Sequence, residues 1–231
     1  MPSYKHILFD LDHTLWDFDK NCCETLEELH QLHNLSRLGF SAAQFFSEYK
    51  RINVNMWREY NAGRITKEEI RESRFELTFT ALGVPEDLVP GELNEQFIKR
   101  CPAKSHVFPH THKVLEYLSD KKYILHILTN GFSEIQQIKM NAARLENYFS
   151  EVIHSESCGY LKPDKKMFDY ALDRIKANPQ ECIMIGDDLE ADIIGARNAG
   201  IDHIYFNPAR QEHREDVTHE ISCLSELIHI L

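Results

Sequence analysis

A short apolar run near the start of the chain ends in two acidic residues. Residues 7–9 read Ile-Leu-Phe and are followed by Asp10 and, one residue later, Asp12. A short apolar run of this kind predicts a strand buried on both faces, as in a parallel sheet. Side chains two apart on a strand point the same way, so we expect the two carboxylates to share one cleft. Because burying unpaired carboxylates costs several kcal/mol, we also expect a positive partner nearby.

Net charge and cysteine content narrow the classes of protein to consider. The 231 residues carry a formal charge of −11, which argues against binding a nucleic-acid polymer over a broad face. No apolar run approaches the ~20 residues that a membrane-spanning helix needs, and residues 1–5 show no secretory pattern. The six scattered cysteines fit reduced thiols. We therefore expect a cytoplasmic protein, a monomer or homodimer, with no membrane partner.

Helical periodicity dominates the stretch that follows the first strand. Residues 11–20 are predicted to be a loop, and helices are predicted at about 21–34, 41–60, 66–82 and 92–100. Ser41 with Gln44, and Thr66 with Glu69, have the spacing of capping boxes. No strand pattern interrupts these helices. Residues 17–100 are therefore predicted to form an inserted helical-bundle cap domain.

From residue 101 onward, helical and strand patterns alternate. Strands are predicted at 123–128, 151–154, 181–185 and 202–206, with helices between them and a terminal helix at 222–231. Ser133 and Gln136 again have capping-box spacing, at the start of the helix 133–144. Alternation of this kind indicates βαβ units. The fold prediction is an α/β protein whose core domain, residues 1–16 and 101–231, is a Rossmann-like doubly wound parallel sheet.

Polar or charged residues follow each of four predicted strands. In open α/β sheets, ligands bind beyond the carboxyl ends of the strands, so these residues are expected to converge. They are Asp10 and Asp12 after the first strand, Thr129, Asn130 and Gly131 after the second, Lys162 after the third, and Asp187, Asp188 and Asp192 after the fourth.

The needs of phosphoryl transfer account for this set. A divalent cation held by Asp10 and Asp187 would cancel the charge of a phosphate near carboxylates, and Mg²⁺ prefers such oxygen ligands. Lys162 adds a positive charge, while the Thr129 hydroxyl and the amides after it can donate to phosphate oxygens. One carboxylate can attack phosphorus, and a second can transfer the proton.

These segments resemble the four motifs of haloacid dehalogenase superfamily phosphatases. The matching segments, in order, are Asp-Leu-Asp-His-Thr-Leu at 10–15, Thr-Asn-Gly at 129–131, Lys-Pro at 162–163, and Gly-Asp-x-x-x-x-Asp at 186–192. The resemblance extends along the whole chain, including the helical cap. It implies a Mg²⁺-dependent phosphomonoester hydrolase that works through an aspartyl phosphate.

The resemblance also implies a role for each motif residue. Asp10 is then the nucleophile and a metal ligand, and Asp12 is the general acid/base, which also binds the metal through its carbonyl oxygen. Thr129 and Lys162 hold the phosphoryl group, together with Asn130 and Gly131.

The resemblance assigns different roles to the three acids of the fourth motif. Asp187 ligates the metal, directly or through water. Asp192 supports the residues that bind the metal or orients Lys162. Asp188 is likewise expected near the metal without binding it directly. Without the other motifs, a simpler interpretation of Asp187 and Asp188 is that they cap the next helix.

Three stretches are similar to YjjG-type pyrimidine 5′-nucleotidases. They are residues 56–66 with 74–75, residues 129–133, and residues 162–172. This similarity implies a nucleoside monophosphate as substrate. Trp57 and Tyr60 are spaced i, i+3 on an amphipathic helix, a pattern that more often indicates burial than ligand contact. The candidate specificity residues are Phe18, Trp57, Tyr60 and Phe132.

Other functions remain open. The substrate can be another small phosphorylated metabolite, such as a sugar phosphate or phosphoglycolate, and a phosphomutase shares the phosphoaspartate. A 2-haloacid dehalogenase needs neither a leaving-group acid nor a metal, so Asp12 and Asp187 argue against it. A catalytically idle binding module is disfavoured because Asp10 and Lys162 are both present.

Overall fold

The chain divides into two compact units. The structure is a computed structural model that describes residues 4–231, and residues 1–3 of the predicted core domain lie outside the described residues. One unit comprises Met1–Asp17 and Ser105–Leu231, and the other comprises Phe18–Lys104. The predicted domain bounds, after residues 16 and 100, differ from these by one and four residues.

A parallel sheet forms the centre of the first unit. Its spatial order is β3-β2-β1-β4-β5-β6, and every neighbouring pair is parallel. The order reverses beside β1, which creates the crevice where open α/β sheets bind ligands. The prediction of an α/β fold with a parallel sheet is confirmed. The strands are β1 (His6–Phe9), β2 (Ile124–Thr129), β3 (Phe149–His154), β4 (Cys182–Gly186), β5 (Asp202–Phe206) and β6 (His219–Ile221).

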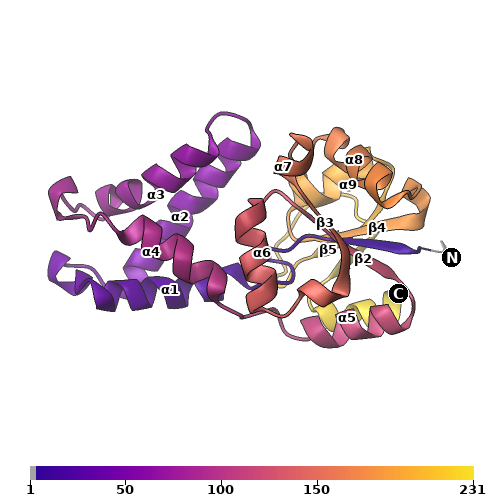
Figure 1. The fold of residues 1–231 in the computed structure, drawn as a ribbon, viewed down its shortest axis with the longest axis horizontal. Coiled ribbons are helices and arrows are strands. Elements are labelled where there is room, and N and C mark those ends of the chain that lie inside the picture. The colour runs from indigo at the N-terminus through magenta and orange to yellow at the C-terminus, as the bar shows by residue number, and fades with distance from the viewer. Residues whose placement is uncertain (1–3) are drawn as a thin grey trace. The chain divides into compact units, whose positions relative to one another are not determined.

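Helices cover both faces of this sheet, which is why most residues of its central strands are apolar. Figure 1 shows α8 and α9 on one face and α5 on the other. Leu8, Leu128 and Met184 pack with Phe168 of α8 in one buried cluster. The helices of this unit are α5 (Thr111–Asp120), α6 (Ser133–Ala142), α7 (Ser155–Cys158), α8 (Lys165–Ile175), α9 (Gly195–Asn198) and α10 (Leu227–Ile230).

The second unit is helical throughout Phe18–Lys104, as predicted. Both predicted capping boxes form, at Ser41 with Gln44 and at Thr66 with Glu69. Its interior contains a cluster of aromatic rings, in which Tyr49 lies 5.0 Å from Phe97 between ring centroids. The helices are α1 (Phe18–Leu32), α2 (Ala42–Asn61), α3 (Lys67–Ala81) and α4 (Leu93–Arg100). Helix α1 therefore begins inside the segment 11–20 that was predicted to be a loop.

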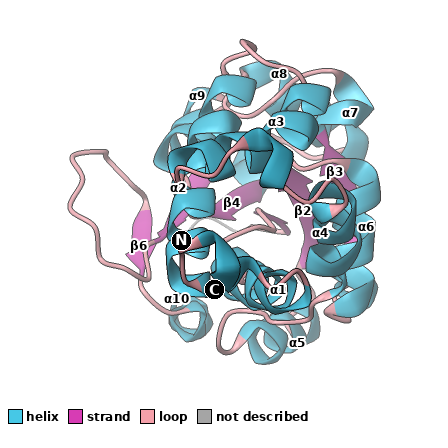
Figure 2. Cartoon of the chain, turned by 90° about the vertical axis from the view of Figure 1, so that its left-hand side faces the viewer, coloured by secondary structure: helices cyan, strands magenta, loops and turns pink. Residues whose placement is uncertain are grey.

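The C-terminal segment differs from its prediction. Residues 222–231 do not form one helix, because α10 covers only the last turn after a short 3₁₀ segment. Before it, β6 adds an edge strand beside β5, and Figure 2 shows β6 with the long loop that precedes it. The sequence did not predict β6 because this strand has only three residues and only one of them, Ile221, is buried. A stretch this short shows no alternation of apolar and polar residues.

Two local predictions on the sheet unit were also wrong. Residues Leu189–Ile194 form a π-helical turn ahead of α9, where the pattern between the strands 181–185 and 202–206 predicts one helix over residues 189–199. Ser133 does not cap α6, because Phe132 occupies the cap position and the Gln136 side chain turns away from the helix start. Both departures lie beside the candidate site, where such irregularities are common.

None of the helices within residues 4–231 is both long and apolar enough to cross a membrane.

Short 3₁₀ segments connect several of these elements. The 3₁₀ segments are Leu35–Leu38, Glu86–Leu88, Cys101–Ala103, Glu146–Tyr148, Pro179–Glu181 and Leu224–Glu226.

Candidate active site

The ends of three adjacent strands bring most of the predicted residues together. Asp10 follows β1, Thr129 ends β2, and Asp187 follows β4. The loop that carries Lys162 is tied to the end of β2 by Asn130. The Asn130 side chain donates to the Lys162 carbonyl at 2.9 Å and accepts from the Lys162 amide at 2.8 Å. The Asn130 side chain therefore positions the lysine.

Lys162 is buried among acceptors. Its Nζ donates to Asp10 Oδ1 and Asp192 Oδ1, both at 2.6 Å, and to the Leu128 carbonyl at 2.8 Å. Burial acts to lower the pKa of this lysine, but the carboxylates of Asp10 and Asp192 outweigh it and the pKa is raised. Lys162 is therefore charged. Of the two roles considered for Asp192, orienting Lys162 is the one that the contacts favour.

Three carboxyl groups crowd around this one lysine. Oxygen atoms of Asp10, Asp187 and Asp192 lie within 4.8 Å of one another. Burial, followed by the charge of Asp192, raises the pKa of Asp10 to about 7. Burial and the charges of Asp10 and Asp192 raise the pKa of Asp187 well above its usual range. The raised pKa values show that a cluster without a cation resists full ionisation. Three ionised carboxylates against one ammonium would leave two negative charges, which one divalent cation would compensate.

The donor set fits such a cation. Both Asp192 oxygens already accept hydrogen bonds, one from Lys162 and one from the Asp188 amide at 3.1 Å. Asp187 accepts from the Thr14 hydroxyl at 3.0 Å through one oxygen. Asp10 and Asp187 are thus the residues that would hold the ion through their second oxygens, and hard cations such as Mg²⁺ prefer carboxylate ligands. Ligation by the Asp12 carbonyl oxygen stays a prediction.

Asp12 has different partners from the other acids. Lys139 Nζ lies 2.7 Å from both of its carboxylate oxygens, and Gln136 Nε2 donates to one of them at 2.9 Å. Burial acts to raise the pKa of Asp12, but the Lys139 charge and these hydrogen bonds outweigh it and the pKa is lowered. Lys139 and Gln136 were not predicted. Their i, i+3 spacing directly after the second motif is the signal that marks them.

The Thr129 hydroxyl is oriented by its neighbours. It accepts from the Gly131 amide at 3.1 Å and from Gln136 Nε2 at 2.8 Å. A hydroxyl oxygen has two lone pairs, so these two donors leave Thr129 to act as a donor itself. It is therefore poised to donate to an anionic ligand such as a phosphate oxygen.

Asp188 caps the turn that follows β4. Its side chain accepts from the amides of Glu190 and Ala191, both at 2.9 Å. This is the simpler interpretation offered above for the fourth motif. Its backbone amide also bonds Asp192, so Asp188 reaches the acid cluster through that residue.

The four candidate specificity residues are divided between the two units. Phe132 belongs to the sheet unit and is buried at the N-terminus of α6. Phe18, Trp57 and Tyr60 belong to the helical unit and are half-buried. The rings of Trp57 and Tyr60 meet edge to face, 5.5 Å apart between centroids. Neither ring is fully buried, so each retains some surface.

Comparisons with known proteins agree with this chemistry. Residues 4–200 match the haloacid dehalogenase-like hydrolase family. The chain belongs to this family. It is 34% identical to pyrimidine 5′-nucleotidase YjjG of Escherichia coli K12, over 97% of this chain and 96% of that protein. It is 31% identical to pyrimidine 5′-nucleotidase PynA of Streptococcus pneumoniae, over 99% and 95%.

A solved structure supports the same assignment. The magnesium-bound crystal structure of the putative HAD-hydrolase YfnB from Bacillus subtilis matches with a TM-score of 0.87 at 29% identity, covering 98% of each chain. The chain is accordingly a hydrolase enzyme that is similar in sequence to pyrimidine 5′-nucleotidases.

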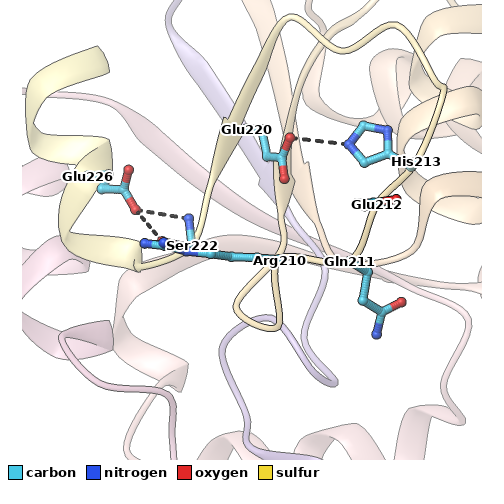
Figure 3. Close-up of a pocket in the computed structure, with 7 residues that line it drawn as sticks. All are labelled: Arg210, Gln211, Glu212, His213, Glu220, Ser222 and Glu226. Carbon is cyan, nitrogen blue, oxygen red and sulfur yellow. Dashed lines mark hydrogen bonds and ion pairs between the residues drawn. The ribbon is translucent and has the colours of Figure 1, made fainter.

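An open surface pocket elsewhere in the sheet unit contains none of these site residues (Figure 3). Several of its charged groups are paired with one another or with nearby polar groups. Glu220 lies 3.2 Å from His213 Nε2, and Glu226 accepts from the Ser222 amide at 2.9 Å. We assign this pocket no ligand. It is lined by Arg210, Gln211, Glu212, His213, Glu220, Ser222 and Glu226.

Proposed function

We propose that this protein is a Mg²⁺-dependent phosphomonoester hydrolase that acts on pyrimidine nucleoside monophosphates through an aspartyl phosphate on Asp10. The observation that carries this proposal is the buried cluster of three carboxylates around Lys162. With all three carboxylates ionised, the cluster carries two negative charges more than Lys162 offsets, which a divalent cation would compensate. A bound Mg²⁺ would neutralise charge and polarise the phosphoryl group.

The first step transfers the phosphoryl group to the protein. A carboxylate oxygen of Asp10 forms a bond to phosphorus, and the bond between phosphorus and the leaving oxygen breaks. Asp12 gives a proton to that oxygen, which leaves as an alcohol. Asp12 is ionised in the free enzyme, so it takes up this proton when the anionic substrate binds beside it, because a neighbouring negative charge raises a carboxyl pKa.

The second step returns Asp10 to its starting state. The Asp12 carboxylate takes a proton from water, the water oxygen bonds to phosphorus, and the bond from phosphorus to Asp10 breaks. Inorganic phosphate leaves, and Asp12 again carries a proton. Throughout, Lys162 offsets negative charge and the Thr129 hydroxyl donates to a phosphoryl oxygen.

The choice of substrate rests on the relatives. YjjG and PynA are pyrimidine 5′-nucleotidases, and the similarity to both extends over nearly the whole chain. The half-buried rings of Trp57 and Tyr60 are candidates for stacking on a base, with Phe18 and Phe132 as further candidates.

The nucleophile is tested by Asp10→Asn. We expect the variant to lose at least about 10³-fold in kcat on every substrate while keeping its fold, because a covalent step cannot start without the carboxylate. Asp169→Asn is the matched control, since Asp169 lies on α8 in an exposed ion pair with Lys165. Substantial turnover by Asp10→Asn would refute the assignment of the nucleophile.

The substrate class is tested by a phosphate-release screen over nucleoside monophosphates, sugar phosphates and phosphoglycolate. We expect pyrimidine nucleotides to rank at the top and EDTA to abolish the activity. A sugar phosphate at the top would overturn the nucleotide assignment and leave the phosphatase intact. Metal-independent release of halide from a 2-haloacid would overturn both.

A further inference from the structure

Two residues of α6 hold the side chain of Asp12 from one direction. Gln136 and Lys139 are spaced i, i+3 and therefore lie on one face of the helix. Lys139 contacts both oxygens of the Asp12 carboxylate at 2.7 Å, and Gln136 contacts one of them at 2.9 Å. Together they bind the carboxylate in one orientation with charge-assisted hydrogen bonds.

Lys139 is itself fixed in place. Its side chain is 6% exposed, and its Nζ lies over the ring of Trp16, 4.7 Å from the centroid. Trp16 is fully buried and forms a backbone bridge with Asp12 in the loop after β1. The lysine therefore lies between the loop that carries Asp12 and an aromatic ring anchored in the same loop. A surface lysine would have no such restraint.

Gln136 connects Asp12 to the second motif. The same Nε2 atom donates to Asp12 and to the Thr129 hydroxyl. Only an N–H group can face the carboxylate, which fixes the orientation of the amide. Its Oε1 atom is buried and has no partner among residues 4–231, a cost that an apolar side chain would avoid. A glutamine at this buried position is therefore explained by the two hydrogen bonds that its Nε2 group donates, to Asp12 and to Thr129.

Gly131 makes room for this amide. A Cβ atom at position 131 would lie 2.2 Å from Gln136 Nε2, so any other residue would displace it. The glycine of the second motif therefore permits the contact between Gln136, Thr129 and Asp12.

We propose that Lys139 and Gln136 are positioning residues that hold the Asp12 carboxyl in the orientation needed to protonate the leaving oxygen. This inference rests on the proposed function and extends it to residues outside the four motifs. Both residues act through Asp12, and neither is placed in contact with the substrate.

The test compares two leaving groups. An alkyl phosphate, here the best substrate of the screen, needs a proton on its leaving oxygen, whereas p-nitrophenyl phosphate releases a stable phenolate. The kcat/KM value reports steps only up to departure of the leaving group. For Lys139→Met and Gln136→Met we expect kcat/KM to fall about 10- to 100-fold on the alkyl phosphate and less than about 3-fold on p-nitrophenyl phosphate.

A second comparison separates positioning from direct contact. In the Asp12→Asn background, Lys139→Met should cause no further loss on the alkyl phosphate, because the residue through which it acts is already disabled. Lys139→Arg keeps the charge and the donors and should recover part of the activity. If Lys139→Met does not fold, Gln136→Met carries the same test, and circular dichroism of each variant checks the fold.

Matched controls lie close by on exposed positions. Gln137 is exposed on α6 and bonds only to Asn141 among the contacts of residues 4–231, so Gln137→Met should leave both kcat/KM values unchanged. Lys121 is exposed and lies 5.4 Å from the centroid of the Tyr117 ring, so Lys121→Met removes a comparable lysine–ring contact.

Equal losses on both substrates, or a further loss in the Asp12→Asn background, would overturn the inference while the proposed function stands. If the wild-type protein hydrolyses neither phosphate ester, the proposed function fails first and the inference falls with it.

Discussion

Lys162 and the acids around it show how strongly single residues constrain one another. The lysine uses its three N–H groups on Asp10, Asp192 and a backbone carbonyl, all deep in the protein. Removing one member of a buried charge network typically costs about 3–5 kcal/mol, because the remaining charge loses its partner. The same crowding keeps Asp10 beside a positive charge, which would help the proposed nucleophile to approach an anionic phosphate.

Gly186 lies so close to the side chain of Asp192 that no larger residue fits at this position. A Cβ atom at this position would lie 2.1 Å from Asp192 Oδ2 and 2.6 Å from Asp192 Cβ. Gly186→Ala should therefore displace Asp192 and destabilise the protein by about 2 kcal/mol or more. Urea unfolding measures this change.

The matched control for that substitution is Gly91→Ala. A Cβ atom at position 91 would meet nothing within 4 Å. Its free energy of unfolding should stay within about 0.5 kcal/mol of the wild-type value. Similar values for the two variants would refute the steric explanation.

At the scale of elements, strands β1 and β2 carry a histidine pair in which His126 is buried and His6, at the start of β1, is partly buried. His6 Nδ1 lies 3.1 Å from His126 Nε2, with the rings stacked 5.3 Å apart between centroids. Burial, followed by the charge of His6, lowers the pKa of His126 to about 4, although Glu151 opposes the shift. The pKa of His6 is also lowered, by burial and then by Lys5 against the opposing charge of Glu181.

This pair predicts a loss of stability in mild acid. An unfolded histidine titrates near 6.5, and His126 in the folded protein titrates lower, so only the unfolded state takes up a proton as the pH falls below 6.5. We expect the free energy of unfolding to fall by about 1 to 2 kcal/mol between pH 7.5 and 5 through His126.

Urea unfolding of wild-type protein and His126→Gln at both pH values measures this contribution, and the difference between the two proteins removes the effect of other groups. The variant should show the shallower pH dependence. His219→Gln, at an exposed position on β6, should match the wild type. Parallel pH dependence of His126→Gln and wild type would contradict the prediction.

On the scale of the whole molecule, the acid cluster joins two distant parts of the sequence. Asp10, Asp187 and Asp192 follow two adjacent strands, and mutual repulsion among their ionised carboxylates would oppose the fold, which a bound cation would relieve. A ligand that binds only the folded state stabilises it by mass action. Binding of the proposed cation would therefore be linked to folding of the sheet unit.

The linkage predicts a thermal shift. At a Mg²⁺ concentration about 100 times its Kd, binding adds about 2.7 kcal/mol, which corresponds to about 5–10 °C in Tm for a chain of this size. Scans in EDTA and in MgCl₂, at equal ionic strength, measure the shift. Asp187→Asn should show less than about half of it, and an equal shift in that variant would place the ion elsewhere.

Local patterns determined a large part of this protein. The apolar runs and their alternation with helices predicted the parallel sheet, and both capping boxes of the helical unit formed where the spacing placed them. Asp10, Thr129 and Asp187 were found because they lie at strand ends, which are positions that the sequence marks directly, whereas Lys162 lies farther on, in the loop after β3. Such features depend on residues that are close in the sequence, so they can be predicted from the sequence alone.

Contacts across the chain were decided only by the tertiary structure. Gln136 shows why, because its spacing from Ser133 suits a capping box, yet its side chain lies 2.9 Å from Asp12, 124 residues away. Lys139 contacts the same carboxylate. Asp192 lies in a π-helical turn and accepts a hydrogen bond from Lys162. Buried polar groups need partners, and in this site the packing of α6 against the loop after β1 selects them. The sequence therefore supplied the motif residues, and the tertiary structure decided which side chains hold them in place.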